Sequence, residues 1–293
     1  MAHAEVKRPW RLWLLLALTT ALALACICIH RRDTTLTLTH YEVAAEVSAP
    51  LRIVHLSDLH SREYGQDNET LIAMVAEQNP DLIFLTGDML NRKGTAEDIP
   101  PQCDLITRLA QIAPVYWADG NHEKIFLAAT GVDLHRRLAQ AGAVVLDSTW
   151  ADVTVKGQAL RIGGYYGYYG TPHMTLDDPA AITAEECFFA EFEDTERVKL
   201  LLCHIPTSWV DWGYINTRPV DLIFSGHYHG GQIRLPFIGG LYAPYVGFFP
   251  EYTRGVFAGE QGVCVLSAGM GSEPGIPRVN NPPEILVVDL IPK

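Results

Sequence analysis

Residues 222–231 read Leu-Ile-Phe-Ser-Gly-His-Tyr-His-Gly-Gly, and this stretch decides how the rest of the chain is interpreted. Its apolar start predicts a short buried strand, and Gly226 would then turn the chain sharply. His227 and His229 would lie at the carboxyl end of that strand, where open α/β sheets bind ligands. Histidine is the commonest metal ligand, although a single His-x-His pair is often part of an ordinary loop. The pair therefore gains meaning only from the other strand ends.

Composition places the chain among globular α/β proteins. It has 293 residues, 48% of them hydrophobic, with 24 glycines and 18 prolines, which is unlike a disordered or coiled-coil chain. The net charge of −12 argues against a nucleic-acid partner, because a nucleic-acid-binding face is basic. A solvated acidic surface accounts for most of this charge, and a carboxylate-rich metal site is compatible with it. The six cysteines lack CxxC spacing and predict buried thiols without a disulfide framework.

Residues 12–29 are an uncharged, apolar run that predicts a transmembrane helix. At 1.5 Å per residue the run would span roughly 27 Å, close to the hydrocarbon thickness of a bilayer. A cleaved signal peptide is the alternative, but no good small-residue cleavage site precedes a polar sequence. Three basic residues before the run and two after it only slightly favour a cytoplasmic N-terminus. The predicted organisation is a flank (1–11), an anchor (12–29), a linker with the first strand (30–50) and one domain (51–293).

Alternating strands and helices predict one α/β domain after the linker. Apolar runs and period-two alternation predict strands at 34–39, 51–57, 81–85, 115–117, 144–146, 151–155, 160–162, 198–203, 221–225, 232–235, 263–266 and 285–290. Helical periodicity with Pro, Asn or Gly boundaries predicts helices at 68–78, within 102–112, at 132–140 and at 180–192. The Gly- and Tyr-rich residues 163–170 are either an exposed aromatic loop or a flexible wall over a substrate.

Five of these strands run directly into side chains that can bind a metal. The side chains are Asp58, His60, Asp88, Asn121, His204, His227 and His229. Because strand ends of one sheet system lie on one face, they can converge. Each alone would more often be a capping or loop residue, but five coincidences of one kind favour a shared site. Carboxylate, amide and imidazole ligands suit Mn, Fe or Zn.

The motifs around these residues resemble those of the calcineurin-like metallophosphoesterases. The matching motifs are Asp58-x-His60, Gly87-Asp88, Gly120-Asn121-His122-Glu123, His204 and Gly226-His227-x-His229, in the right order across residues 50–290. Residues 230–236 and 281–285 resemble a narrower, membrane-anchored bacterial group that includes UDP-2,3-diacylglucosamine pyrophosphatases of lipid A synthesis. The resemblance implies a four-layer αββα sandwich, preceded here by the transmembrane helix. Asp119 and the tyrosine-rich residues 165–169 depart from the family pattern.

The resemblance also implies a dinuclear site. Asp58, His60 and His229 would hold the first divalent ion, Asn121, His204 and His227 the second, and Asp88 would bridge both. The expected ions are Mn, Fe or Zn, with Mn favoured. Two such ions about 3.5–4 Å apart can clamp a phosphoryl group and generate hydroxide at neutral pH.

Four further residues are candidates for supporting roles. His122 is the candidate general acid for the leaving oxygen, with a structural loop histidine as the alternative. Glu123 would orient the metal ligands without binding an ion itself. Arg234 and Arg278 could bind phosphate, although a surface salt bridge is the commoner role for an arginine.

The expected function is a dinuclear-metal phosphodiesterase or pyrophosphatase that acts on a lipid- or nucleotide-linked phosphoester, such as UDP-2,3-diacylglucosamine in lipid A biosynthesis. The expected location is the bacterial inner (plasma) membrane, crossed once by the N-terminal helix, with the side of the domain left open. One alternative is a phosphatase or phosphodiesterase on a phosphoprotein or cell-wall polymer. Another is a non-catalytic membrane scaffold, which should lack ligands, whereas none is missing. The sequence does not indicate an oligomeric state.

Overall fold

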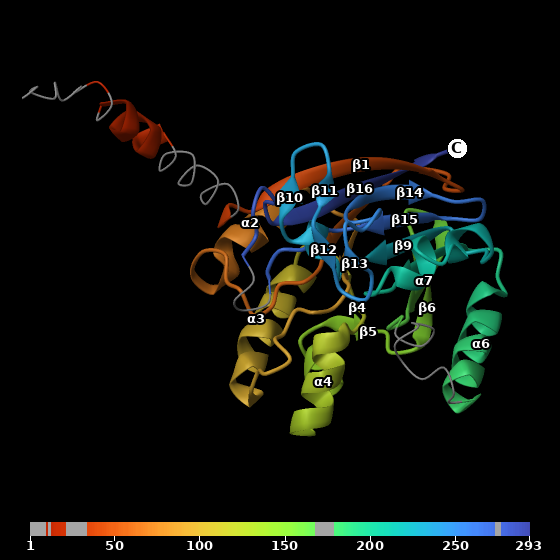
Figure 1. The fold of residues 1–293 in the computed structure, drawn as a ribbon. Helices are drawn as coiled ribbons and strands as arrows, with labels where there is room; N and C mark the ends of the chain where they lie inside the picture. The colour runs from red at the N-terminus through yellow and green to blue at the C-terminus, as the bar shows by residue number, and fades with distance from the viewer. Residues whose placement is uncertain (1–9, 11–12, 22–33, 168–178, 273–276) are drawn as a thin grey trace, which may run out of the picture.

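The computed structural model describes residues 10, 13–21, 34–167, 179–272 and 277–293 (Figure 1). Two six-stranded mixed sheets form its centre. Sheet A has the order β1 (Thr37–Ala45), β16 (Glu284–Pro292), β2 (Leu51–Leu56), β3 (Leu82–Leu85), β4 (Val115–Trp117), β5 (Ala143–Val145). Sheet B has the order β14 (Gly255–Ala258), β15 (Val263–Leu266), β9 (Leu222–Ser225), β8 (Val198–Leu202), β7 (Gln158–Gly164), β6 (Thr149–Val155). Two small hairpins join β10 (Arg234–Leu235) to β11 (Gly239–Gly240) and β12 (Tyr242–Ala243) to β13 (Gly247–Phe248).

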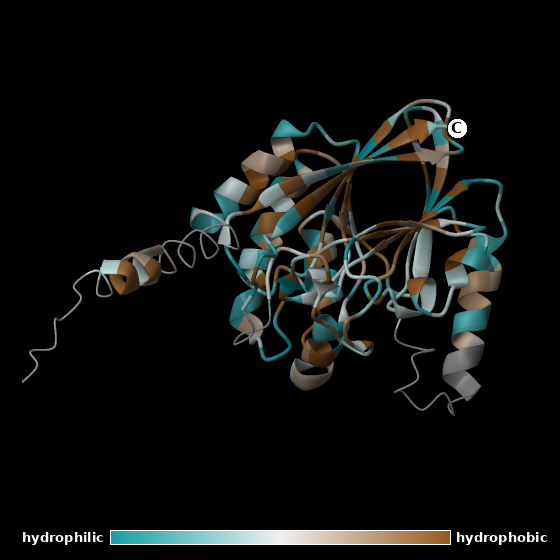
Figure 2. Ribbon diagram, turned by 45° about the horizontal axis from the view of Figure 1, so that its top comes forward, coloured by the Kyte–Doolittle hydropathy of each residue, from teal (hydrophilic) through white to brown (hydrophobic). Residues whose placement is uncertain are grey.

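The two sheets pack face to face because their central strands are apolar on both faces. In β3, Leu82 and Phe84 point into the core between the sheets, while Ile83 and Leu85 point into the core under the helices. Sheet B alternates in the same way, with Phe224 in the core between the sheets and Ile223 on the outer side. Figure 2 shows these strands in brown at the centre of the molecule.

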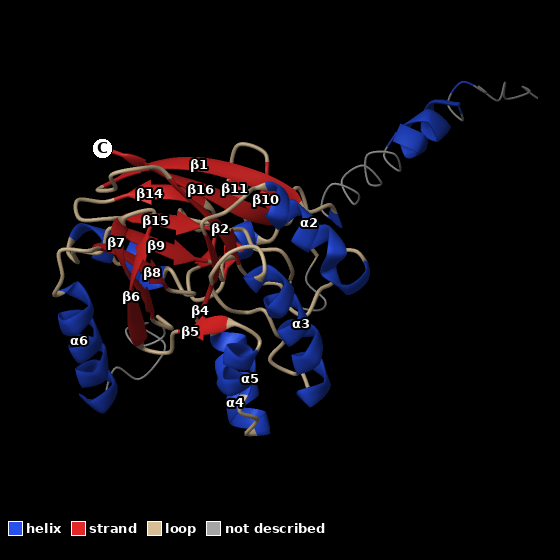
Figure 3. Ribbon diagram, turned by 180° about the vertical axis from the view of Figure 1, so that it is seen from behind, coloured by secondary structure: helices blue, strands red, loops and turns tan. Residues whose placement is uncertain are grey.

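Helices cover the outer face of each sheet. On sheet A lie α2 (Glu69–Glu77), α3 (Ile99–Ala110), α4 (Asn121–Thr130) and α5 (Leu134–Gln140), whose apolar residues share one core with β2–β4. On sheet B lie α6 (Pro179–Glu193) and α7 (Thr207–Val210), which share another core with β8, β9 and β15. Figure 3 shows the two groups of helices on opposite sides of the strands. The predicted α/β class, with helices outside two sheets, is confirmed.

Several element boundaries differ from the sequence-based predictions. Helix α3 begins at Ile99 and contains both prolines in its first turn, where a missing backbone N–H is tolerated. Helix α4 was not predicted, because its first turn is the Gly-Asn-His-Glu motif, which was interpreted as a loop. The edge strand β14 was also missed. Strand β1 starts at Thr37 rather than residue 34, where its pairing with β16 begins.

The predicted anchor is only partly covered by the structure. Residues 13–21 are helical, whereas residues 12 and 22–29 lie outside the described part of the chain. Within the described residues, no helix is both long enough and apolar enough to cross a membrane. The transmembrane helix over residues 12–29 therefore stays a prediction.

The parallel strands set the position of the site. Strands β2, β3 and β4 run parallel in sheet A, and β7, β8 and β9 run parallel in sheet B. Their carboxyl ends meet at one edge of the sandwich, which brings together loops that are far apart in sequence. All five predicted ligand-bearing loops leave the sheets at this edge.

Candidate metal centre

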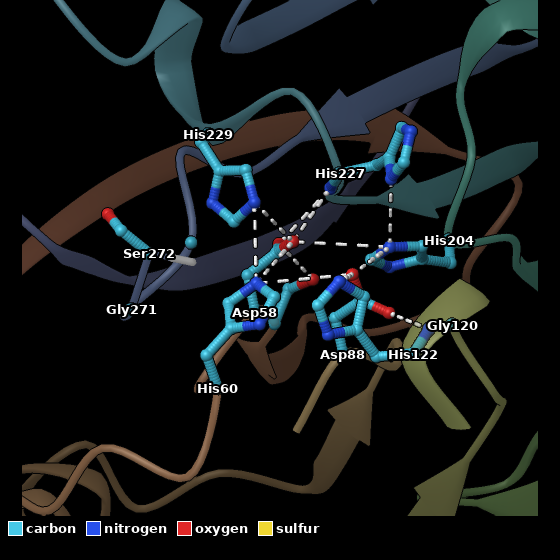
Figure 4. Close-up of polar contacts among 12 residues, drawn as sticks. Asp58, His60, Asp88, Gly120, His122, His204, His227, His229, Gly271 and Ser272 are labelled. Carbon is cyan, nitrogen blue, oxygen red and sulfur yellow. Dashed lines mark hydrogen bonds and ion pairs between the residues drawn. The ribbon is translucent and has the colours of Figure 1, made fainter. Parts of the chain in front are cut away.

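Six of the seven predicted ligands converge at the shared edge of the two sheets (Figure 4). They form two groups whose ligand atoms lie within 4.8 Å of one another, namely Asp58, His60 and His229, and Asp88, His204 and His227. All six of these side chains are buried. Asn121 is the first residue of α4, directly beside the second group, and its Oδ1 atom is buried as well. The structure thus brings these predicted residues together at one edge of the sandwich.

The backbone at this edge is held in unusual conformations. Asp58, His60, Asp88, His227 and His229 all have φ between 47° and 72°. This left-handed region is sparsely populated by residues other than glycine, and such residues cluster at functional sites. No pattern in the sequence indicates it.

Two glycines let the loops approach closely. A Cβ at Gly226 would lie 2.0 Å from Ser57 Oγ and 2.2 Å from Asp58 Oδ2. A Cβ at Gly87 would lie 2.0 Å from the backbone nitrogen of Gly120. Any side chain at these positions would push apart the loops that carry the ligands.

Backbone and hydroxyl donors hold the two carboxylates. Asp58 accepts from Ser57 Oγ at 2.6 Å and from the backbone N–H of His227 at 3.1 Å. Asp88 Oδ1 accepts from the backbone N–H of His122 at 2.8 Å. The other oxygen, Asp88 Oδ2, lies 3.1 Å from His204 Nε2 and 3.9 Å from His60 Nε2. Asp88 thus reaches both groups, as a bridging ligand must.

The histidines are spaced as ligands of shared cations. The Nε2 atoms of His60 and His229 lie 3.3 Å apart, and His227 Nδ1 lies 3.2 Å from His204 Nε2. Two nitrogens bound to one ion at about 2.1 Å each would be roughly 3–3.5 Å apart. His204 Nδ1 lies 2.7 Å from the Thr86 carbonyl oxygen, which can only accept, so Nδ1 donates and Nε2 is the ring nitrogen that faces the cluster.

Unpartnered buried atoms also fit a metal site. Asn121 Oδ1 and His227 Nε2 are buried without a hydrogen-bond partner in the described part of the chain. A buried polar atom without a partner is costly, and the binding of an ion is one of its ordinary explanations. Together with the spacing and the mixed oxygen and nitrogen donors, these atoms show that the residues fit divalent cations.

The pKa values follow from burial and from the two carboxylates. Burial lowers the pKa of His60 to about 3 and holds the pKa of His229 well below its usual range, so both rings are neutral. Burial also opposes charge on His204, but the Asp88 carboxylate outweighs it and raises that pKa to about 9. Burial raises the pKa of Asp58 to about 6. The cluster therefore combines neutral imidazoles with a carboxylate, Asp88, that strongly attracts positive charge.

His122 and Glu123 occupy the first turn of α4. His122 Nδ1 accepts the backbone N–H of Arg92 at 3.0 Å, so the neutral ring carries its proton on Nε2, which lies 3.8 Å from Asp88 Oδ2. Glu123 accepts from the backbone N–H groups of Asp88, Gly120 and Leu90 at 2.7, 2.8 and 2.9 Å. Glu123 thereby ties together the loops after β3 and β4.

A cavity of about 320 Å³ opens onto the cluster. Asp88, Asn121, His122, His227 and His229 form its floor, and Arg92, Gln232, Tyr242, Pro244 and Tyr245 complete the lining. Arg92 is exposed, and sequence reasoning missed it; the only signal was its place four residues after the Gly-Asp motif.

The two arginines that were considered as phosphate ligands or surface ion pairs bond to loop atoms in the described part of the chain. Arg278 is buried and donates to the backbone carbonyls of Ala268, Gly269 and Gly271. Arg234 donates to the carbonyl of Gly230 at 2.7 Å and to Thr253 Oγ1 at 2.9 Å. Both shape the loops around the site, and neither lines the cavity.

Tyr228, which lies between the two histidines of the opening motif, anchors their loop. Its ring is fully buried, and its hydroxyl lies 2.7 Å from both Thr207 Oγ1 and Asp211 Oδ2. This aromatic side chain therefore points into sheet B's outer core while its neighbours His227 and His229 point into the cluster.

The departure at Asp119 belongs to a charged cluster behind Asn121. Buried Asp119 accepts from Trp117 Nε1 at 2.8 Å and pairs with His135 at 2.8 Å and Lys124 at 3.1 Å. Lys124 also pairs with Asp147 at 2.6 Å. In the tyrosine-rich loop, Tyr165 is buried and stacks on Phe188, so this residue is core rather than exposed; residues 168–178 lie outside the described chain.

Comparison with known proteins agrees with this geometry. Residues 51–231 match the model of the calcineurin-like phosphoesterase family, which is more than half of the chain. The chain belongs to this family and is a metal-dependent phosphohydrolase. The non-catalytic scaffold considered above is thereby set aside.

Individual relatives are distant. The chain is 27% identical over 246 residues to phosphodiesterase YaeI of Escherichia coli, covering 83% of each chain. It is 27% identical over 241 residues to the uncharacterized metallophosphoesterase YkuE of Bacillus subtilis, covering 82% of this chain and 78% of the relative. It is 24% identical over 279 residues to the UDP-2,3-diacylglucosamine pyrophosphatase LpxG of Chlamydia muridarum, covering 81% and 83%.

Proposed function

We propose that this chain is a dinuclear-metal phosphodiesterase or pyrophosphatase that acts on a lipid- or nucleotide-linked phosphoester at a bacterial inner membrane. UDP-2,3-diacylglucosamine is the first substrate to try. The observation that carries the proposal is the pair of ligand groups on either side of Asp88, each with two imidazole nitrogens 3.2–3.3 Å apart.

Each ligand group would hold one cation. Asp58, His60 and His229 would hold the first, and Asn121, His204 and His227 the second, with Asp88 shared. When bound, two such ions supply Lewis acidity and hydroxide at neutral pH. The mixed ligands are compatible with Mn, Fe or Zn, and Mn is our preferred choice for a first assay.

The residues of the cavity would orient the phosphoester and protonate its leaving group. His122 lines the cavity and carries its proton on Nε2, because Arg92 N–H occupies its other ring nitrogen. It is therefore placed to donate a proton to the leaving oxygen. The Arg92 guanidinium, at the cavity wall, carries the fixed positive charge that suits a phosphate oxygen. Glu123 would keep Asp88 and the Asn121 turn in register.

The diester and membrane parts of the proposal have separate support. A diester is favoured because YaeI is named a phosphodiesterase, and a UDP-lipid because LpxG is named for that pyrophosphatase activity. The membrane is favoured by the predicted anchor, which ends seven residues before β1. Hydrolysis of a phosphoprotein or a cell-wall polymer is the competing proposal, and it would use the same residues.

The experiment compares three variants of the full chain in detergent with Mn supplied. Asp88→Asn removes the shared ligand and should lower bis(4-nitrophenyl) phosphate hydrolysis by more than about 100-fold, with less bound metal. His122→Ala should lower it about 100- to 10,000-fold with metal content unchanged. Exposed His40→Ala is the matched control and should behave as the unaltered chain.

A substrate panel then separates the candidate substrates. UDP-2,3-diacylglucosamine should be turned over faster than 4-nitrophenyl phosphate or a phosphopeptide. Full diesterase activity in Asp88→Asn would refute the site, and preference for the phosphopeptide would refute the lipid-linked substrate while leaving the site intact.

A further inference from the structure

One uncharged segment next to the site exposes most of its large apolar side chains. Residues 235–250 contain no Asp, Glu, Lys or Arg, in a chain whose net charge is −12. They build the β10–β11 and β12–β13 hairpins (Figure 1). We call the exposed apolar residues of this segment the apolar rim: Phe237, Ile238, Tyr242, Val246, Phe248 and Phe249.

The rim is unusual within this molecule. Phe237 is fully exposed, and Phe248 is 72% exposed. In the described residues after position 34, the only other exposed large hydrophobic side chains are the isolated Ile125 and Val144. Scattered apolar residues are normal on a surface, whereas their concentration in one uncharged segment points to a binding surface.

The rim is continuous with the mouth of the cavity. Tyr242 belongs to both the rim and the cavity lining, and Tyr245, three residues on, stacks on the ring of His227 at 5.2 Å. Leu241 joins the two hairpins to the metal-site loop, because its N–H donates to the carbonyls of Gly231 and Ile233. A molecule that covers the rim therefore lies against the entrance to the site.

The chain enters the domain at the same edge. Thr37, the first residue of β1, pairs with Glu284, and its N–H donates to the Pro283 carbonyl. The N–H of Glu284 in turn donates to the carbonyl of Gly269, which lies beside Asp58. The Arg234 N–H of β10 donates to Val279, a few residues before Glu284. Seven residues separate the predicted anchor from Thr37, a reach of at most about 25 Å. This short segment between the predicted anchor and β1 therefore keeps one edge of the sandwich close to the bilayer. That edge is the one that carries the rim and the site.

We propose that the apolar rim inserts into the interfacial layer of a lipid bilayer and so presents the cavity to phosphoesters in that layer. This inference deepens the proposed function and rests on it for the lipid-linked substrate. Aromatic and aliphatic side chains partition into this layer, and tyrosine is favoured at its polar boundary. A bilayer suits the rim better than a protein partner, because the segment offers no charge to complement. Attachment through apolar contact also requires no basic patch. Electrostatic binding to anionic lipids would require one, and this chain is acidic.

The direct test measures depth with a fluorophore in the full chain, reconstituted into vesicles of phosphatidylethanolamine and phosphatidylglycerol. Phe248→Cys is labelled with an environment-sensitive dye in a Cys187→Ser background, since Cys187 is exposed. Ile125→Cys, an exposed apolar position on α4, is the matched control. At position 248 we expect quenching by lipid-borne nitroxide and protection from aqueous iodide, with the reverse at position 125.

Iodide quenching at position 248 equal to that at 125 would overturn the proposal. Protection from iodide without lipid quenching, lost on dilution, would also overturn it, because it would mean that a second copy of the chain covers the rim. Lipid quenching that persists at high salt supports apolar insertion over electrostatic attachment.

A functional test uses two diesters with the same leaving group. The triple variant Phe237→Ser, Phe248→Ser, Phe249→Ser should hydrolyse soluble bis(4-nitrophenyl) phosphate as the unaltered chain does. It should hydrolyse vesicle-borne phosphatidyl-4-nitrophenol at least about tenfold more slowly, because it loses three aromatic side chains that would insert into the bilayer. Equal loss on both diesters, or no loss on either, would contradict a role in lipid access. If the unaltered chain cleaves neither diester, the proposed function fails, while the depth measurement still decides the rim.

Discussion

The two sheets contribute different chemistry to one site. The loops of sheet A supply the oxygen ligands, Asp58, Asp88 and Asn121, and one imidazole, His60. The loops of sheet B supply only imidazoles, from His204, His227 and His229. The two metal positions do not follow this division, because each ligand group takes residues from both sheets. The site therefore exists only when the two sheets are packed in register.

The two halves are also held differently. In sheet A, Glu123 accepts three backbone N–H groups and ties the loops after β3 and β4 together. In sheet B, the loop of His227 and His229 depends on the buried hydroxyl of Tyr228 and on the His227 N–H bond to Asp58 across the interface. The loop of sheet B that carries His227 and His229 is thus positioned partly by Asp58 of sheet A. We infer that changes in sheet A will disturb both metals and that changes in sheet B can be confined to one.

The strongest test of this division is to replace His227 and His229 separately by alanine. Each variant should lose more than about 100-fold in diester hydrolysis, because one cation is lost from a two-ion site. Metal analysis should show about one ion per chain in each variant instead of two. His227→Ala should retain the ion of Asp58, His60 and His229, and His229→Ala should retain the other.

The retained ions distinguish the assignment from a simpler one. If both histidines served one ion, the two variants would lose the same metal, which substitution with a spectroscopic ion such as Co would show. Loss of both ions in either variant would mean that sheet B holds the site as firmly as sheet A. The exposed His40→Ala is again the control.

The sequence predicted which residues meet at the site better than it predicted their surroundings. Strand ends carrying Asp, His and Asn are visible because an apolar run and a polar ligand are both local signals. The left-handed backbone at Asp58 and Asp88 and the bonds of Arg278 to loop carbonyls depend on contacts between segments far apart in sequence. Helix α4 was missed because its first turn was interpreted as a loop, and the Glu123 carboxylate that caps this turn also binds Asp88 and Leu90 in a distant loop. Arg92 was missed for the same reason, since only folding places it at the cavity.

An intermediate effect is expected from the residues that brace the two halves. Glu123→Gln replaces a carboxylate that accepts three N–H groups, and it should lower diesterase activity about 10- to 100-fold with weaker binding of both ions. Tyr228→Phe leaves Thr207 and Asp211 without their shared partner, and it should lower the free energy of unfolding by about 1–3 kcal/mol. Its effect on metal binding should be smaller than that of Glu123→Gln, because the loops of sheet A keep their hydrogen bonds to Glu123.

Titration of Mn into each variant, beside thermal unfolding, separates these outcomes. Tyr214→Phe on η3 (Tyr214–Asn216), whose ring packs on Trp209, is the control for loss of a hydroxyl in sheet B's outer core. Equal weakening of both ions in Glu123→Gln and Tyr228→Phe would contradict the difference between the halves.

The smallest effect concerns the charged cluster behind Asn121, which braces sheet A alone. The hydrogen bond from His135 to Asp119 raises the pKa of His135 above its ordinary value. A raised pKa in the folded state contributes stability that is fully present below the unfolded value of about 6.5 and is lost as pH rises through the folded pKa. His135→Gln should therefore lower the melting temperature most at mildly acidic pH and least at alkaline pH, with little change in diesterase activity. Exposed His40→Gln is the control and should have the melting temperature of the unaltered chain at every pH. A melting-temperature difference for His135→Gln that is constant across the pH series would contradict the prediction. It would show that the His135 ring stabilises sheet A by packing and not by its charge.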